Sequence, residues 1–168
     1  GSHRLGARFA VAVALGLRQG EALGLRWQED VDLDGGVIHV RQALQRLKGG
    51  IAFVEPKSPR SRRSLALPAV VGTALKTHRV RQLEERLAAG RKWHESGLVF
   101  TTRLGTPLDP RNVTREFHAL LADASLPRIR FHDLRHTAAT LLLAQGVNPR
   151  TIMETLGHSQ ISLTMDTY

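Results

Sequence analysis

The C-terminal part of the chain places cationic hydrogen-bond donors close in sequence to a single phenol. The donors are Arg135 and the histidines His132, His136 and His158, and the phenol is Tyr168, the only tyrosine of the chain and its last residue. A guanidinium can grip a phosphate, and a hydroxyl that follows it can attack one. This combination indicates phosphoryl transfer.

The HDLRH motif leaves alternatives open. His132, Arg135 and His136 stand three and four residues apart, so on a helix they share one face within a single turn. An ordinary polar helix face is one interpretation. A zinc hydrolase is another, because His132 and His136 have the spacing of the ligands in HExxH. Asp133 in place of the glutamate and the charge of Arg135 disfavour zinc, and the chain has no cysteine for thiolate ligands or disulfides.

A phosphate site explains more of the pattern, because a phosphodiester under attack gathers charge on two non-bridging oxygens. The planar fork of arginine holds two such oxygens and stays protonated, so Arg18 and Arg135 are suited to clamp them. Arg18 has apolar neighbours on both sides and needs an anionic partner, either Glu21 or a ligand phosphate. Lys57, on a basic turn, suits protonation of a leaving 5′-oxygen. A solvated loop is an equal alternative for this turn.

The phenol requires activation, because its ordinary pKa of about 10 leaves it almost wholly un-ionised at neutral pH. His132 is the preferred base, and a positive pocket would lower the pKa further. His158 follows a helix stop at Gly157 and can donate to a phosphate oxygen or to Tyr168. Position alone favours a plain amphipathic residue at Tyr168, so the prediction depends on the other groups.

Composition bounds the partners. The formal net charge is +9, from 24 Lys+Arg against 15 Asp+Glu, which favours nucleic acid over an ordinary basic domain. A chain of 168 residues with 42% hydrophobic content is long enough for one compact domain. No apolar run approaches the roughly 20 residues that span a bilayer. The absence of cysteine fits a reducing cytoplasm.

The elements that must position these groups are mostly helices. Hydrophobic spacing predicts helices at 5–17, 21–27, 70–89, from Asp109-Pro110 toward Pro127, at 131–145 and at 149–156. Alternation predicts strands at 37–40, 51–55 and 64–67, joined as an antiparallel meander with a basic tip. The expected fold is therefore mainly α with a small three-stranded antiparallel β-sheet in a single compact domain.

Four separated motifs resemble the catalytic domain of the tyrosine recombinases, the phage-type integrases, and the resemblance covers almost the whole chain. The motifs are GLRQGEALGLRW with Arg18, PKSPRSRRSLALP with Lys57, FHDLRHTAATLLLAQGV with His132 and Arg135, and LGHSQISLTMDTY with His158 and Tyr168. Their order and spacing together are highly specific, although each motif alone is weak. Gly20 departs from the pattern, since many members carry a serine or threonine helix cap there.

The resemblance implies a reaction without metal or cofactor. Tyr168 would attack a DNA phosphodiester, leaving a 3′-phosphotyrosyl link and a free 5′-hydroxyl, and a 5′-hydroxyl from a partner duplex would reverse the step. The implied catalytic residues are Arg18, Lys57, His132, Arg135, His158 and Tyr168, with Glu21 and His136 in supporting positions. The predicted DNA contacts are Arg60, Arg62, Arg63 and Arg130.

The resemblance also implies partners and a domain organisation. The partners are double-stranded DNA at attachment sites, further protomers in a synaptic tetramer, and accessory DNA-bending or directionality proteins, with no membrane involved. The expected place is the bacterial cytoplasm, associated with the nucleoid. Residues 1–3 resemble an expression-tag remnant, and residues 4–168 are expected to form the catalytic domain, without the N-terminal core-binding domain and the C-terminal tail.

Two rivals remain at this point. A type IB topoisomerase has similar chemistry and a related fold, but it nicks and reseals one duplex without exchanging partners. A DNA-binding domain that has lost catalysis is the second. The complete set of six side chains argues against it, because a pure binder has no need of Tyr168.

Overall fold

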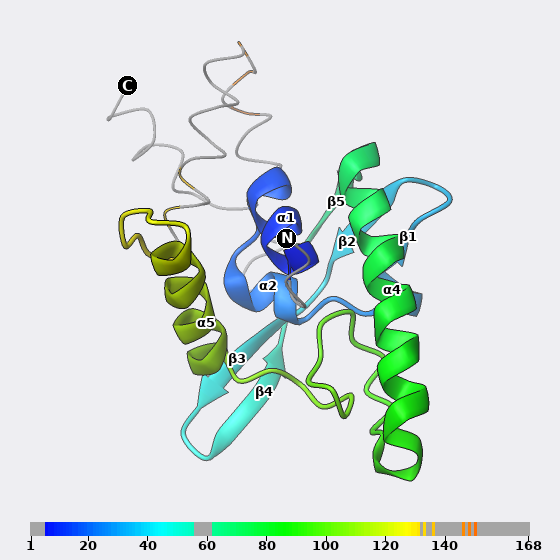
Figure 1. The fold of residues 1–168 in the computed structure, drawn as a ribbon. Coiled ribbons are helices and arrows are strands. Elements are labelled where there is room, and N and C mark those ends of the chain that lie inside the picture. Colours follow the sequence, from blue (N-terminus) through cyan, green and yellow to red (C-terminus); the bar gives the residue numbers. More distant parts are fainter. Residues whose placement is uncertain are drawn as a thin grey trace.

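The computed structural model describes residues 6–55 and 62–131, together with residues 133, 136, 146, 148 and 150. The helices in this part are α1 (Gly6–Leu15), α2 (Gln19–Leu23), α3 (Trp27–Asp30), α4 (Ala69–Ala89), the 3-10 turn η2 (Gly90–Lys92) and α5 (Pro110–Asp123). The strands are β1 (Val31–Asp32), β2 (Val37–Val40), β3 (Ala43–Leu47), β4 (Gly50–Val54) and β5 (Arg63–Ala66). Helices α1 and α2 lie between α5 and α4 (Figure 1).

Several predicted site residues lie outside the described residues. They are Lys57, Arg60, His132, Arg135, His158 and Tyr168. The predicted helix at 149–156 also lies outside them, except for Arg150. Of the predicted helix at 131–145, Phe131, Asp133 and His136 are described, and all three are helical.

The long helices agree with the sequence prediction. Helix α4 covers the predicted 70–89 segment and buries Val71, Leu75, His78 and Gln82 on its inner face. Helix α5 begins at Pro110, and the Asp109 carboxylate accepts a hydrogen bond from the backbone N–H of Arg111 at 2.9 Å. That bond, together with the nearby Arg46 guanidinium, holds the pKa of Asp109 below its usual value.

The second predicted helix is wrong in its extent. The segment 21–27 is not one helix, because α2 stops at Leu23 and α3 starts at Trp27. The chain has to turn at Gly24, where an added Cβ would lie 2.9 Å from the carbonyl oxygen of Gln42. Such an approach is open only to a residue without a side chain.

A three-stranded antiparallel sheet is present, which confirms the predicted fold class, but its strands are not all the predicted ones. The order is β1-β2-β5, and β2 pairs directly with β5 in the register His39↔Ser64. The predicted meander inserted the segment 51–55 between these two strands. That segment instead belongs to β4, which pairs with β3 in a separate hairpin.

The turn after β3 explains the error. Gly49 and Gly50 have φ of 99° and 141°, a backbone that favours glycine, and they fold β4 back onto β3 with Leu47 opposite Gly50. The β3 sequence ALQRL lacks the β-branched alternation of a strand, so it carried no signal of its own. Pairing across the hairpin decided its conformation.

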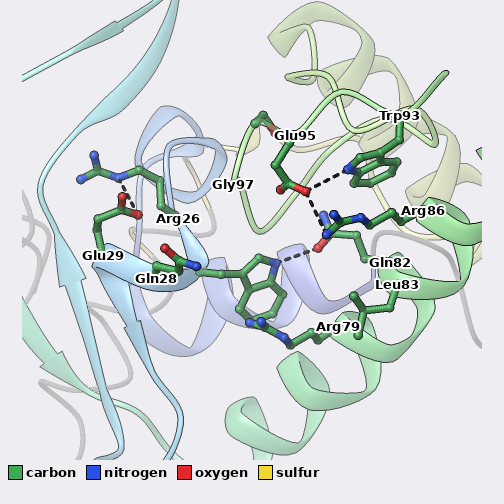
Figure 2. A pocket seen from close by; sticks show the side chains of 12 residues that line it. Arg26, Gln28, Glu29, Arg79, Gln82, Leu83, Arg86, Trp93, Glu95 and Gly97 are labelled. Atoms are coloured by element: carbon green, nitrogen blue, oxygen red, sulfur yellow. Dashed lines mark hydrogen bonds and ion pairs between the residues drawn. The ribbon is translucent and has the colours of Figure 1, made fainter. Parts of the chain in front are cut away.

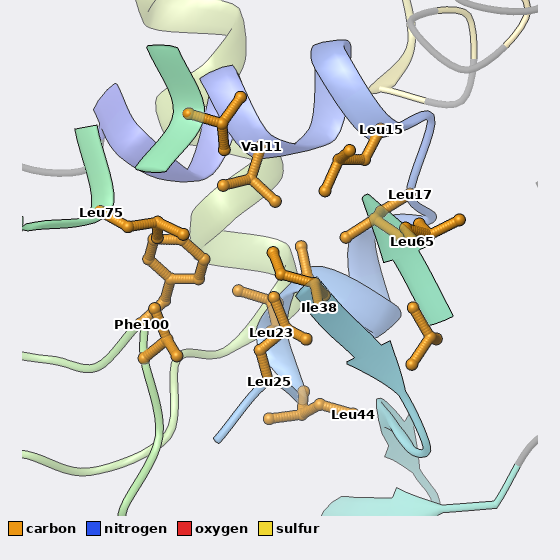
Figure 3. Close-up of a cluster of buried hydrophobic side chains, with 14 of the residues drawn as sticks. Val11, Leu15, Leu17, Leu23, Leu25, Ile38, Leu44, Leu65, Leu75 and Phe100 are labelled. Carbon is orange, nitrogen blue, oxygen red and sulfur yellow. The ribbon is translucent and has the colours of Figure 1, made fainter. Parts of the chain in front are cut away.

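The main core lies between α1, α2, α4 and the three-stranded sheet (Figure 3). Its labelled members in the figure are Val11, Leu15, Leu17, Leu23, Leu25, Ile38, Leu44, Leu65, Leu75 and Phe100, each at most 6% exposed. A second cluster packs Ala12 of α1 against Phe117 and Leu121 of α5 and against Phe131. Helix α1 therefore contacts both clusters, and it leads directly into the first arginine motif.

Candidate active site

Arg18 immediately precedes the first residue of α2 and follows Leu17, which belongs to the main core. It is the N-cap residue of that helix, with an extended backbone (φ −67°, ψ 152°), and the preceding Leu17 is 1% exposed. The Arg18 side chain itself is exposed to solvent. Burial of Leu17 thus holds the backbone on the N-terminal side of Arg18, while the Arg18 side chain stays accessible to a ligand.

Glu21 is a buried carboxylate at the start of α2, and the side chain that pairs with it is Arg63. Its carboxylate accepts the backbone N–H of Arg18 at 2.9 Å, while Arg63 donates from Nη1 to Oε2 at 2.9 Å and from Nη2 to Oε1 at 3.2 Å. The Arg63 and Glu21 side chains are 5% and 6% exposed. Of the two anionic partners that the sequence left open for the Arg18 side chain, the Glu21 carboxylate is therefore paired with Arg63 instead. Arg18 is exposed and needs no internal anion.

Gly20 is required by packing rather than by capping. A Cβ at Gly20 would lie 2.6 Å from the backbone oxygen of Leu44, so α2 can approach β3 only with glycine there. Arg18 is the N-cap residue of α2. Glu21, the third residue of the helix, accepts a hydrogen bond from the backbone N–H of Arg18. The prediction that Gly20 stands in for a serine or threonine cap is thus wrong, and the absence of a hydroxyl has a steric cause.

Arg63 opens β5, two positions after the last residue of the undescribed 56–61 segment that carries Lys57. The sequence prediction treated Arg63 as a DNA contact like its neighbour Arg62. The structure separates them, because Arg62 is exposed and the guanidinium of Arg63 is engaged by Glu21. This geometry favours a positioning role for Arg63.

A sequence signal for the buried arginine existed. Residues two apart in a strand point to the same face, and Leu65, two residues after Arg63, is a core residue. Alternation therefore places Arg63 on the inner face and Arg62 on the outer one. The many positive charges of residues 60–63 (RSRR) concealed the different orientations of Arg62 and Arg63.

The start of the second motif is anchored by an aromatic contact. Phe131, which immediately precedes His132, packs edge-on against Phe117 with ring centroids 5.5 Å apart. The backbone N–H of Arg130 donates to the Asp133 carboxylate at 3.0 Å, and the Arg130 guanidinium, 81% exposed, lies 3.5 Å from the same carboxylate. His136 is half-buried. The Arg130 side chain is exposed to solvent, and its predicted contact with DNA stays a prediction.

A hollow of about 450 Å³ lies elsewhere, between α3, α4 and the segment 93–97 (Figure 2). Trp27 donates from Nε1 to Gln82 Oε1 at 2.7 Å, and the Arg79 guanidinium lies 4.7 Å from the Trp27 ring. At the rim, Arg86 pairs with Glu95 at 3.0 Å. Of the predicted site residues that the structure describes, none lines this hollow.

The described ranges contain no group of three or more histidine, aspartate or glutamate side chains arranged to hold a metal ion. A helix long and apolar enough to cross a membrane is likewise missing from the described part of the chain.

Residues 2–168 match the model of the phage integrase family. The chain belongs to the phage integrase family. The predicted resemblance to tyrosine recombinases is thereby confirmed over almost the whole sequence.

Relatives of this phage integrase chain include a tyrosine recombinase XerC-like protein of Caldanaerobacter subterraneus subsp. tengcongensis. It is 40% identical over 178 residues, which cover 99% of this chain and 45% of the relative. An integrase of Streptomyces ambofaciens is 38% identical over 178 residues, covering 96% of this chain and 43% of that protein. The chain spans less than half the length of these two curated relatives.

Solved structures support the same assignment of the fold. The Tn1549 transposon integrase in complex with transposon right end DNA matches with a TM-score of 0.82 at 25% identity, over 98% of this chain and 54% of that one. The XerA recombinase matches with a TM-score of 0.71 at 26% identity, over 96% and 50% of the two chains. The phage integrase chain therefore has the tyrosine recombinase catalytic fold.

Proposed function

We propose that this protein carries out site-specific DNA recombination, as in the integration and excision of a mobile element, through a tyrosine nucleophile. The observation that carries the proposal is the family match over residues 2–168, because it includes all four motifs in order. Relatives are named as integrases and as a tyrosine recombinase, and the Tn1549 integrase was solved with DNA. The net charge of +9 agrees with a polyanionic substrate.

The chemistry divides among the proposed catalytic residues. Tyr168 forms a bond to the scissile phosphorus, the bond from phosphorus to the 5′-oxygen breaks, and Lys57 supplies the proton to that oxygen. The two arginines, Arg18 and Arg135, hold the non-bridging oxygens as charge builds on them. The accessible guanidinium of Arg18, on a backbone locked by Glu21, supports this role. Losing one such donor costs about 10²–10³ in rate.

The two histidines complete the proposed set. His132 accepts the phenol proton of Tyr168, and His158 donates to a phosphate oxygen, so no metal or cofactor enters the reaction. His136 supports the second motif from its half-buried position. Arg60, Arg62 and Arg130 are proposed to contact the DNA backbone, and the exposure of Arg62 and Arg130 supports this.

The partners and setting follow from the same proposal. They are double-stranded DNA at attachment sites, other protomers in a synaptic tetramer, and accessory DNA-bending or directionality proteins, in the cytoplasm on nucleoid DNA. Residues 4–168 are proposed as the catalytic domain, acting together with a core-binding domain and a C-terminal tail.

A nicked suicide substrate tests the proposal in the full-length protein. When the nick lies just 3′ of the attack site, the short 5′-hydroxyl fragment diffuses away and the covalent protein–DNA adduct accumulates. We expect the adduct with the native protein and none with Tyr168→Phe, and we expect an added 5′-hydroxyl duplex to be joined to the trapped strand. Failure of the native protein to form an adduct would contradict the proposed function.

A further inference from the structure

We propose that the outer face of the three-stranded sheet binds a phosphate of the DNA backbone, and that His39 and Ser64 donate hydrogen bonds to it. This inference rests on the proposed function and adds a contact outside the proposed catalytic residues. It is carried by a hollow of about 260 Å³ at the end of the sheet where β2 ends and β5 begins. The residues that line this hollow are His39, Val40, Arg41, Arg62, Arg63 and Ser64.

Strand geometry places His39 and Ser64 together on the outer face. Neighbouring side chains of a strand point to opposite faces, and directly opposed residues of two paired strands share a face. In the register of β2 and β5, His39 is paired with Ser64, and the next pair is Val40 with Arg63. Val40 belongs to the main core, and Arg63 belongs to the buried pair with Glu21. The His39–Ser64 pair therefore faces away from the core.

The His39–Ser64 pair keeps a donor for an anion in every arrangement of its protons. His39 Nδ1 and Ser64 Oγ lie 2.7 Å apart, so they share one hydrogen bond. If the hydroxyl donates to Nδ1, the proton on the other ring nitrogen, Nε2, is left to donate. If Nδ1 donates to the hydroxyl oxygen, the hydroxyl proton is left instead. A doubly protonated ring would leave both donors and add a positive charge.

The charges around the hollow favour an anion. Among the described residues that line it, none has a carboxylate, whereas the larger hollow of Figure 2 includes Glu29 and Glu95. Arg41 is partly neutralised, because its guanidinium lies 3.6 Å from the Asp30 carboxylate and donates to the backbone oxygen of Glu29. Arg62 is exposed at the hollow, and the fork of a guanidinium suits two phosphate oxygens.

The hollow lies close to the segment that carries Arg18. Arg63 lines the hollow and also binds Glu21, whose carboxylate accepts the backbone N–H of Arg18 at 2.9 Å. Duplex DNA carries one negative charge per ~1.7 Å of helix axis, so a duplex that reaches Arg18 brings further phosphates near the sheet. An exposed site binds a lone ion weakly, but a phosphate on a bound duplex has a high effective concentration. DNA is therefore favoured over free phosphate.

Equilibrium binding of the full-length protein to a double-stranded DNA of arbitrary sequence tests the contact. Phosphate contacts do not depend on sequence, so the target site need not be known. Ser64→Val and Ser64→Thr are the matched variants, because valine and threonine have nearly the same shape and differ in the hydroxyl. We expect Ser64→Val to weaken DNA binding about tenfold, and Ser64→Thr to stay within about threefold of the native protein.

The partner histidine should respond in the same way. His39→Leu is expected to weaken DNA binding about tenfold as well, because it removes the ring nitrogens that bond to the hydroxyl and to the phosphate. The double variant His39→Leu, Ser64→Val should lose little more than either single variant, since the two side chains act as one hydrogen-bonded unit. Losses that simply multiply would overturn the shared contact.

Salt dependence supplies a second measurement. Arg62→Gln should reduce the slope of log K against log salt concentration by about 0.9, the change for one lost phosphate contact on duplex DNA. Arg86→Gln is the matched control, because it removes an exposed arginine that lies 3.0 Å from Glu95 in the other hollow. Its affinity and slope should equal those of the native protein. An equal reduction of the slope in both variants would overturn the inference, because net charge alone would explain it.

Equal DNA affinities of Ser64→Val and Ser64→Thr would also overturn the inference. Binding of inorganic phosphate that is lost in Ser64→Val, with DNA affinity unchanged, would assign the hollow to the free ion and overturn the DNA contact. The nicked suicide substrate keeps the proposed function separate. A native protein that binds DNA through Ser64 but forms no adduct would contradict the proposed function and support this contact. An adduct together with equal affinities of the two variants would do the reverse.

Discussion

Two arginine–carboxylate pairs in this molecule have nearly the same length and very different surroundings. Arg63 and Glu21 meet at 2.9 Å with side chains 5% and 6% exposed, and Arg86 and Glu95 meet at 3.0 Å with side chains 55% and 60% exposed. The first pair lies beside Arg18. The second lies at the rim of the hollow that Trp27 and Trp93 line (Figure 2). Distance therefore says little about what an ion pair does.

Solvent explains the difference. An exposed pair is screened by water and salt and contributes about 0–1 kcal/mol, so its residues can change freely. A buried pair gains little net stability while it is intact, but losing one partner leaves an uncompensated charge in the interior. Substitution of either Glu21 or Arg63 should therefore be costly. The intact pair fixes the position of α2 relative to β5.

Breaking the buried pair should have the largest effect. We expect Glu21→Gln to lower the free energy of unfolding by about 3–5 kcal/mol, because it leaves the Arg63 guanidinium buried without its carboxylate. Urea unfolding of the 168-residue chain, followed by circular dichroism, measures the change. The double variant Glu21→Met, Arg63→Met should regain most of the loss. A loss below about 1 kcal/mol for the single variant would show that the pair is not buried in solution.

Packing beside the pair should have an intermediate effect. Gly20→Ala should cost about 1–3 kcal/mol of unfolding free energy, because the new Cβ meets the Leu44 carbonyl oxygen at 2.6 Å and α2 must move away from β3.

The matched control for this substitution is Gly72→Ala in α4. The nearest atom to its added Cβ is a Leu67 methyl carbon at 3.8 Å, so the helix gains stability of about 0.5–1 kcal/mol. Calorimetry of both variants should give melting temperatures that move in opposite directions. A stabilised Gly20→Ala would contradict the close approach of the two segments.

Breaking the exposed pair should have the smallest effect. Arg86→Met is expected to change the free energy of unfolding by less than about 1 kcal/mol, since both side chains remain accessible to water. A double-mutant cycle with Glu95→Gln, at low and at high salt, isolates the coupling between them. A salt-independent coupling of 2 kcal/mol or more, on the order of that for a buried pair, would remove the contrast on which the comparison rests.

Prediction from sequence succeeded where local signals were strong. The 21-residue α4 and the start of α5 at Asp109-Pro110 were predicted because periodicity and capping act within a few residues. It failed for β4, whose partner is β3 rather than β2, because pairing depends on the turn at Gly49-Gly50 and on distant segments. The partner of Glu21 was missed for the same reason, since Arg63 lies 42 residues away.

The sequence by itself determined the family, the mainly α class and the set of groups proposed for chemistry. Residue types and their spacing carry that information, and tertiary contacts are not needed to see it. Only the tertiary structure decided which arginine is accessible and which is buried. Arg18 and Arg63 have the same side chain, and the Glu21 carboxylate lies between the backbone of one and the guanidinium of the other. The physical reason is burial, which leaves the guanidinium of Arg18 in water and that of Arg63 against an internal carboxylate.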